Sequence, residues 1–171
     1  MRDARPFLLA CIAALLLPAP PARAAAEEIG DPYAAYAAGE FDRALQGFVD
    51  LQVEHPDDPR LALHLGSAHY EMKNYAEAEA AFGQAALHGD DPLRERAYYS
   101  LGNNAYRQGK LDEAVEWYKR ALEIDPDDED AKFNLEFVRD EIRRRHEEAQ
   151  KRQQEQQQQQ KQCDNPQQQQ Q

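Results

Sequence analysis

The fold of this chain is decided by one stretch, residues 98–126, which reads YYSLGNNAYRQGKLDEAVEWYKRALEIDP. Aromatic, apolar and small residues recur in it at helical spacing: Tyr98, Leu101, Gly102, Ala114, Tyr118 and Ala121. Gly109 separates a first helix from a second, and Pro126 follows the second helix as a stop signal. The small residues allow the two helix backbones to approach closely, while the larger ones fill the space between them. We therefore expect an antiparallel pair of helices.

The pattern occurs three times, at a period of 34 to 36 residues. It matches at Ala44, Phe48 and Pro56, at Ala78, Phe82 and Ala85, and at Ala114, Tyr118, Ala121 and Pro126. The second unit has Ala62 where the third has an aromatic residue, and its closing turn, residues 89–91, is two residues longer. The first unit is shortened, and Asp31 and Pro32 predict the N-cap and first residue of a short helix. Such units bury their apolar faces by stacking, which predicts a solenoid.

These residues resemble the tetratricopeptide repeat, in which an aromatic residue, Leu and Gly on a first helix precede Ala, an aromatic residue, Ala and Pro. The resemblance implies an all-α helix-turn-helix solenoid of about three repeats. We expect a shortened repeat over residues 27–58, full repeats over 59–92 and 93–128, and a capping helix over 129–152. The apolar stripe of that capping helix consists of Phe133, Leu135, Phe137, Val138 and Ile142.

A Gln-rich tail occupies residues 153–171, where 13 of 19 residues are Gln and Cys163 is the one apolar side chain. Such a segment cannot bury enough apolar surface to fold by itself, so we expect it to be disordered. Gln is nevertheless a fair helix former, which leaves open a continuous helix from Asp130 into the tract.

The N-terminal segment has the organisation of a secretory signal peptide over residues 1–26. A short basic start precedes an apolar run over 7–17, and small residues over 22–26 predict cleavage after Ala24 or Ala26. The eleven-residue run spans only about 16 Å, roughly half a hydrocarbon core, so it is too short for an anchor. These features predict a periplasmic or otherwise exported protein without a stable membrane span; a lipoprotein through Cys11 is the minor alternative.

Composition excludes several classes of function. The chain has 171 residues, enough for one modest domain, and a net charge of -12, which repels nucleic acid. Cleavage after Ala26 would remove three basic and one acidic side chain and bring the net charge to -14. The two cysteines and five histidines form no metal-ligand spacing, and the acidic run over 125–130 lacks the Gly and terminal Glu of a calcium loop. No catalytic set is visible, so we expect neither an enzyme nor a cofactor.

The resemblance implies a partner-binding groove on the inner, concave wall, formed by the first helix of each pair. The matching positions here are Leu63, Ser67, Tyr70, Arg96, Tyr99, Asn103, Tyr106, Arg107, Phe133 and Phe137. Aromatic rings supply contact area, while amide and guanidinium groups satisfy an extended backbone or a carboxylate. For each aromatic residue, ordinary packing between helices remains an alternative. Some family members clamp a C-terminal carboxylate, but Tyr99 stands where that clamp is usually basic.

One more resemblance concerns residues 95–171. The segments LGNNAYRQG over 101–109 and DAKFNLEFV over 130–138, followed by the Gln tail, are similar to the periplasmic tetratricopeptide component of bacterial aerotolerance (Bat) operons. This implies a non-catalytic scaffold that binds von Willebrand A-type membrane proteins in an envelope or oxidative stress system. A chaperone-like assembly factor for outer-membrane, pilus or cytochrome components is the alternative.

Overall fold

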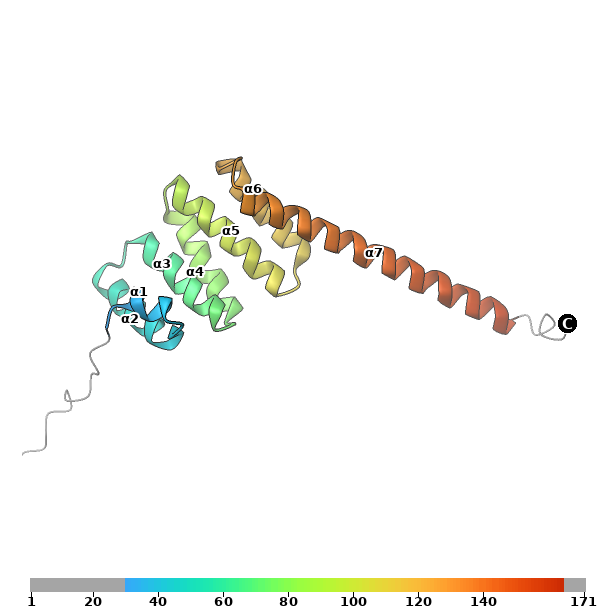
Figure 1. Ribbon diagram of the computed structural model, residues 1–171, viewed down its shortest axis with the longest axis horizontal. Helices are drawn as coiled ribbons and strands as arrows, with labels where there is room; N and C mark the ends of the chain where they lie inside the picture. Colours follow the sequence, from blue (N-terminus) through green and yellow to red (C-terminus); the bar gives the residue numbers. More distant parts are fainter. Residues whose placement is uncertain (1–29, 165–171) are drawn as a thin grey trace, which may run out of the picture.

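The computed structural model describes the backbone of residues 30–164 and the side chains up to residue 161. Within this part the chain is all-α (Figure 1). The helices are α1 (Pro32–Ala37), α2 (Phe41–Glu54), α3 (Pro59–Glu71), α4 (Tyr75–His88), α5 (Asp91–Arg107), α6 (Leu111–Ile124) and α7 (Glu129–Asp164). Neighbouring helices in the sequence pack against each other, which confirms the expected all-helical solenoid. The predicted signal peptide, its cleavage site and the Cys11 alternative lie outside the described residues.

The first helix of each pair starts with an aspartate cap. The carboxylates of Asp31, Asp58 and Asp90 accept backbone N–H bonds at 3.0, 3.0 and 3.2 Å, and a proline follows within the first two helical positions. Such caps satisfy N–H groups that have no partner within the helix. Asp90 therefore starts α5 at Asp91, two residues before the start expected for the third unit.

A different turn links the two helices of each pair. Gly39, Lys73 and Gly109 have positive φ angles of 78°, 64° and 76°. The residue after each of them donates its N–H to a carbonyl five positions earlier, at 2.9 Å in all three turns. This is the Schellman arrangement, which favours glycine because a Cβ is strained there. Lys73 is the one residue of the three that carries this strain.

Each full repeat packs an aromatic ring of its second helix against a glycine of its first. A Cβ built on Gly66 would lie 2.5 Å from the Phe82 ring, and one built on Gly102 would lie 2.5 Å from the Tyr118 ring. Phe82 and Tyr118 are 2% and 1% exposed. These contacts confirm the close approach of helices that the repeat pattern predicts.

The shortened first repeat has no glycine at the corresponding place, which is occupied by Pro32 at the start of the six-residue α1. Tyr33 of α1 instead lies edge-on to Phe48 of α2, with ring centroids 5.1 Å apart. His64 of α3 stacks on Phe48 at 5.2 Å. Tyr33 and His64 thus cover Phe48, which is 1% exposed.

The last repeat is covered by the first part of α7, as expected of a cap. Ala131, Leu135 and Val138 are buried, and Leu135 and Val138 belong to a core cluster with residues of α5 and α6. Glu136 occupies the position that corresponds to Gly66 and Gly102 in the repeats. A charged side chain there prevents another helix from packing closely, so the stacking ends at α7.

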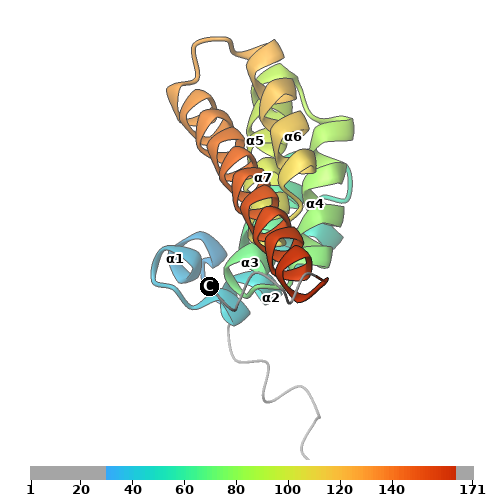
Figure 2. The same ribbon diagram turned by 90° about the vertical axis from the view of Figure 1, so that its right-hand side faces the viewer.

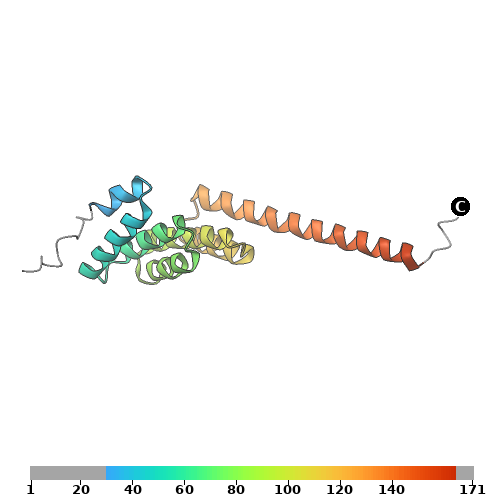
Figure 3. The same ribbon diagram turned by 90° about the horizontal axis from the view of Figure 1, so that it is seen from below.

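Beyond this cap, α7 continues as a single helix that projects from the repeats (Figures 1 and 3). Its 36 residues span about 54 Å. Residues 153–164 are therefore helical, which is the alternative of a continuous helix running into the Gln tract. Residues 165–171 lie outside the described part. Good helix formers without a breaker explain the continuation. None of the described helices combines the length and apolarity needed to cross a membrane.

Candidate functional site

The ten residues predicted for the groove come from α3, α5 and α7, the first helices of the repeats and the cap. We call the side of these three helices that carries the predicted residues the inner wall. Figure 2 looks at the molecule from the α7 side, where α7 crosses in front of α5. The structure divides the predicted residues into a polar network, an aromatic corner, two arginines, one buried residue, and two residues, Ser67 and Tyr70, that line a cavity.

The polar network joins α5, α6 and α7. Asn103 Oδ1 accepts hydrogen bonds from the Tyr118 hydroxyl at 2.7 Å and from Asn134 Nδ2 at 3.3 Å. Asn134 Nδ2 also donates to the Tyr99 hydroxyl at 3.1 Å. Burial raises the pKa of Tyr118, so its hydroxyl stays protonated and acts as the donor. The network leaves the Asn103 Nδ2 and Asn134 Oδ1 groups without a hydrogen-bond partner among the described residues.

Asn134 belongs to the polar network and was not among the residues predicted from the sequence. It follows Phe133 directly and occupies the position of Ser100 on α5. Asn134 lies between two aromatic residues of the predicted set, Phe133 and Phe137, and an amide in that place carries no signal of its own in the sequence of α7. Alignment of α7 with the first helix of the third repeat would have placed Asn134 on the inner wall.

The aromatic corner consists of Tyr106, Phe133 and Phe137. Phe133 and Phe137 stack with ring centroids 6.3 Å apart, and Tyr106 meets Phe137 edge-on at 5.8 Å. Phe133 is 68% exposed and Phe137 44% exposed, which is unusual for paired phenylalanines in a repeat that otherwise buries its apolar residues. Tyr106 is half-buried and supports the pair from α5. The two phenylalanine rings are therefore open to a partner.

Two arginines of α5 are exposed on the inner wall. Arg107 Nε donates to the Tyr75 hydroxyl at 3.4 Å, a long bond that leaves most of the guanidinium free. Arg96 makes no ion pair with any carboxylate among the described residues. The structure does not bring Arg96 into contact with the polar network or the aromatic corner.

Leu63 does not line the groove. It is 4% exposed and belongs to the core cluster of α3, α4 and α5, which includes Phe82, Leu93 and Leu101. The groove position of Leu63 is a correction to the sequence analysis: in this repeat the apolar side chain packs inward, whereas the corresponding Tyr99 keeps its hydroxyl in the polar network. Ser67 and Tyr70, by contrast, are half-buried and line a cavity together with Asn103.

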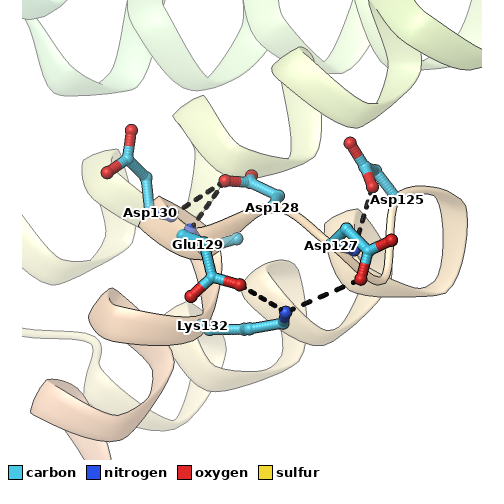
Figure 4. Close-up of polar contacts among 7 residues, drawn as sticks. Asp125, Asp127, Asp128, Glu129, Asp130 and Lys132 are labelled. Carbon is cyan, nitrogen blue, oxygen red and sulfur yellow. Dashed lines mark hydrogen bonds and ion pairs between the residues drawn. The ribbon is translucent and has the colours of Figure 1, made fainter.

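In the acidic turn between α6 and α7, carboxylates accept hydrogen bonds from backbone N–H groups of the turn and of the start of α7 (Figure 4). Asp128 Oδ1 accepts from the backbone N–H groups of Asp130 and Ala131 at 3.0 and 3.1 Å, and Asp125 Oδ1 accepts from that of Asp127 at 2.9 Å. Lys132 Nζ lies 2.7 Å from a Glu129 carboxylate oxygen. Within the described part of the chain, no group of three or more His, Cys, Asp or Glu side chains has the geometry of a metal site.

Stacked helix pairs with an inner wall define this molecule as a helical repeat protein. The model of the tetratricopeptide repeat family matches residues 33–93 and 70–129, which together cover more than half of the chain. The chain therefore belongs to the tetratricopeptide repeat family. Members of this family are protein–protein interaction modules.

Comparisons with individual proteins agree on the fold. Human general transcription factor 3C polypeptide 3 is 28% identical over 103 residues, 54% of this chain, and this chain spans 11% of that protein's length. The first TPR domain of human RPAP3 superimposes with a TM-score of 0.63 at 23% identity, over 68% of this chain and 90% of that domain. The first TPR of Spaghetti (RPAP3), bound to an HSP90 peptide, gives 0.61 at 24% identity, over 65% and 86%.

Proposed function

We propose that this chain is a non-catalytic, exported interaction scaffold whose inner wall binds a von Willebrand A-type membrane partner in an aerotolerance or envelope-stress system. The observation that carries the proposal is the pairing of the polar network with the exposed aromatic corner. Amides suit an extended backbone, and exposed rings suit an apolar side chain of the partner. Family membership supports the interaction role, while the similarity of residues 95–171 to the Bat component suggests the partner.

The proposed export rests on the N-terminal segment. Mass spectrometry of the protein recovered from its native host should find an N-terminus near Ala25 or Glu27. An intact Met1, or a lipid on Cys11, would contradict the periplasmic assignment.

The binding test uses the mature protein and the extracytoplasmic von Willebrand A domain of the partner in a calorimetric titration. Replacing Tyr99, Asn103 and Arg107 together by alanine should weaken binding at least tenfold, about 1.4 kcal/mol. Val53 and Leu87, 78% and 71% exposed on the second helices, supply the matched control. The double alanine variant at these two positions removes exposed apolar surface away from the inner wall and should bind normally.

Circular dichroism of both variants must match that of the unchanged protein, because Asn103 also accepts a bond from Tyr118. Equal weakening by the control variant, or binding that survives the triple change but requires the Gln tract, would contradict the proposed site. Capture of unfolded clients without stable binding of the von Willebrand A domain would instead support the chaperone-like assembly factor.

A further inference from the structure

A cavity of about 160 Å³ opens on the inner wall, lined by residues of α1, α3, α4 and α5. Its lining consists of Tyr36, Ser67, Tyr70, Glu71, Phe82, Ser100 and Asn103. The predicted groove includes Ser67, Tyr70 and Asn103, but the sequence analysis assigned no separate site here.

Two serines create the hollow. Ser67 on α3 occupies the position of Asn103 on α5 and Phe137 on α7, and Ser100 occupies the position of Asn134 on α7. The larger residues at the corresponding places fill the polar network and the aromatic corner, whereas the serines leave space. The cavity therefore lies where two serines replace larger residues of the repeat pattern.

The chemistry of the lining suits a cation. Rings of Tyr36, Tyr70 and Phe82 form part of the walls, and aromatic faces attract ammonium groups. The Ser67 hydroxyl donates to the Leu63 carbonyl at 2.9 Å and lies beside the Tyr36 hydroxyl. The cavity therefore presents hydroxyl oxygens that can accept a bond from a ligand. Glu71 carries the one formal charge among the lining residues, and that charge is negative.

Glu71 acts electrostatically on both tyrosines of the cavity. Burial raises the pKa of Tyr36 and of Tyr70, and the negative charge of Glu71 adds to both shifts. The positive charge of Arg107 opposes the shift of the Tyr70 pKa, and the Ser67 hydroxyl opposes that of the Tyr36 pKa. Both hydroxyls therefore stay neutral at neutral pH and remain able to accept a hydrogen bond from an ammonium group. The whole chain has a net charge of -12, which further favours a basic ligand.

We propose that this cavity, the cation pocket, receives a lysine side chain of the protein partner. A lysine ammonium has three rotatable donors, which match hydroxyl and carboxylate acceptors spread around a small cavity better than the planar arginine fork does. Asn103 belongs both to the cation pocket and to the polar network, so a segment with its lysine in the pocket continues directly over the amides. The inference rests on the proposed function and adds that the bound segment of the partner carries a positive charge.

The first experiment tests the pocket without the partner. Amide chemical shifts of the ¹⁵N-labelled mature protein are followed during titration with Nα-acetyl-lysine methylamide. The norleucine analogue, which lacks the ammonium group, and the arginine analogue are the reference ligands. We expect saturable shifts at Ser67, Tyr70 and Ser100 with the lysine probe, and at least fivefold weaker binding of the norleucine probe.

Three variants check the assignment. Glu71→Gln keeps the shape of the rim and removes its charge, so it should weaken the lysine probe at least threefold. Ser67→Asn introduces the residue of the next repeat, fills the cavity and should abolish the local shifts. Glu77→Gln, an exposed acid of α4 outside the lining, changes the net charge equally and should leave binding unchanged.

Absence of shifts at Ser67, Tyr70 and Ser100, equal binding of the norleucine probe, or insensitivity to Glu71→Gln would each overturn the inference. Stronger binding of the arginine probe would overturn the choice of lysine.

In the titration with the von Willebrand A domain, Glu71→Gln and Ser67→Asn should each weaken binding at least fivefold. Partner binding that survives both changes but is lost in the Tyr99, Asn103 and Arg107 variant would retain the proposed function and reject the cation pocket. Saturable shifts with the lysine probe, together with no binding of the von Willebrand A domain, would retain the cation pocket and reject the proposed function.

Discussion

The ring of Tyr118 lies directly over the α-carbon of Gly102, so a Cβ at Gly102 would be 2.5 Å from Tyr118 Cε1. The same tyrosine donates its hydroxyl to Asn103 Oδ1 at 2.7 Å. One side chain of α6 therefore packs against the core side of α5 and also fixes an amide of the inner wall. In the second repeat Phe82 makes the corresponding ring contact with Gly66 but has no hydroxyl, and Ser67 stands where Asn103 does.

Replacing Gly102 by alanine should lower the free energy of unfolding by about 1–2 kcal/mol, because the new methyl group forces the Tyr118 ring and α5 apart. Gly83 of α4 is the matched control, since a Cβ there would have no atom within 4 Å. Gly83→Ala should raise the free energy of unfolding by about 0.5–1 kcal/mol through better helix propensity. Chemical denaturation measures both variants. Equal effects at the two glycines would disprove the packing role of Gly102.

Changing Lys73 to glycine should stabilise the fold. Lys73 has a φ of 64° in the turn between α3 and α4, where the other two repeats have glycine. Relief of the left-handed strain, offset by the greater freedom of glycine in the unfolded chain, should raise the free energy of unfolding by about 1 kcal/mol. The reverse change, Gly109→Lys, should lower it by a similar amount. A loss of stability in Lys73→Gly would show that the lysine side chain contributes more than its backbone costs.

The sequence predicts the helix pairs well, because glycine, alanine and aromatic residues at fixed intervals determine how closely helices can approach. Gly102 and Tyr118 are identified from spacing and found in contact. The prediction that Leu63 lines the groove was wrong. Position within a repeat specifies which face of the helix a side chain occupies, but the burial of that side chain depends on neighbours from other helices. The cation pocket could not be predicted for the same reason. Its lining comes from α1, α3, α4 and α5, and only the folded structure brings Tyr36 next to Ser100.

The two parts of α7 should differ in their effect on stability. Leu135 is 7% exposed and packs against α5 and α6, so Leu135→Ala should cost about 2–4 kcal/mol. Deleting residues 153–171 should leave the melting temperature unchanged, because the side chains described from 143 to 161 are all exposed and hold no core contact. Thermal denaturation followed by circular dichroism tests both changes. A lower melting temperature after the deletion would show that the far part of α7 packs on the repeats.

Glu95 should make the stability of the fold depend on pH. Burial, followed by a hydrogen bond and charge repulsion with Asp128, raises the pKa of Glu95 to about 7, from an ordinary value of 4.5. The folded protein thus holds the proton more tightly than the unfolded chain does. The stabilisation that Glu95 contributes is therefore complete below about pH 4.5 and is lost as the pH rises through about 7.

Glu95→Gln removes this ionisation while it keeps the shape of the side chain. At pH 8 the free energy of unfolding of the variant should be about 1 kcal/mol higher than that of the unchanged protein. This value is reduced for solvent screening, because the group is partly exposed. At pH 5 the difference should be much smaller, because Glu95 is then protonated in the folded protein and only partly ionised in the unfolded chain. Glu123→Gln, an exposed acid of α6, controls for the change in net charge. Urea denaturation at pH 5, 6, 7 and 8 measures the difference, and a constant offset at all four values would show that Glu95 does not titrate in this range.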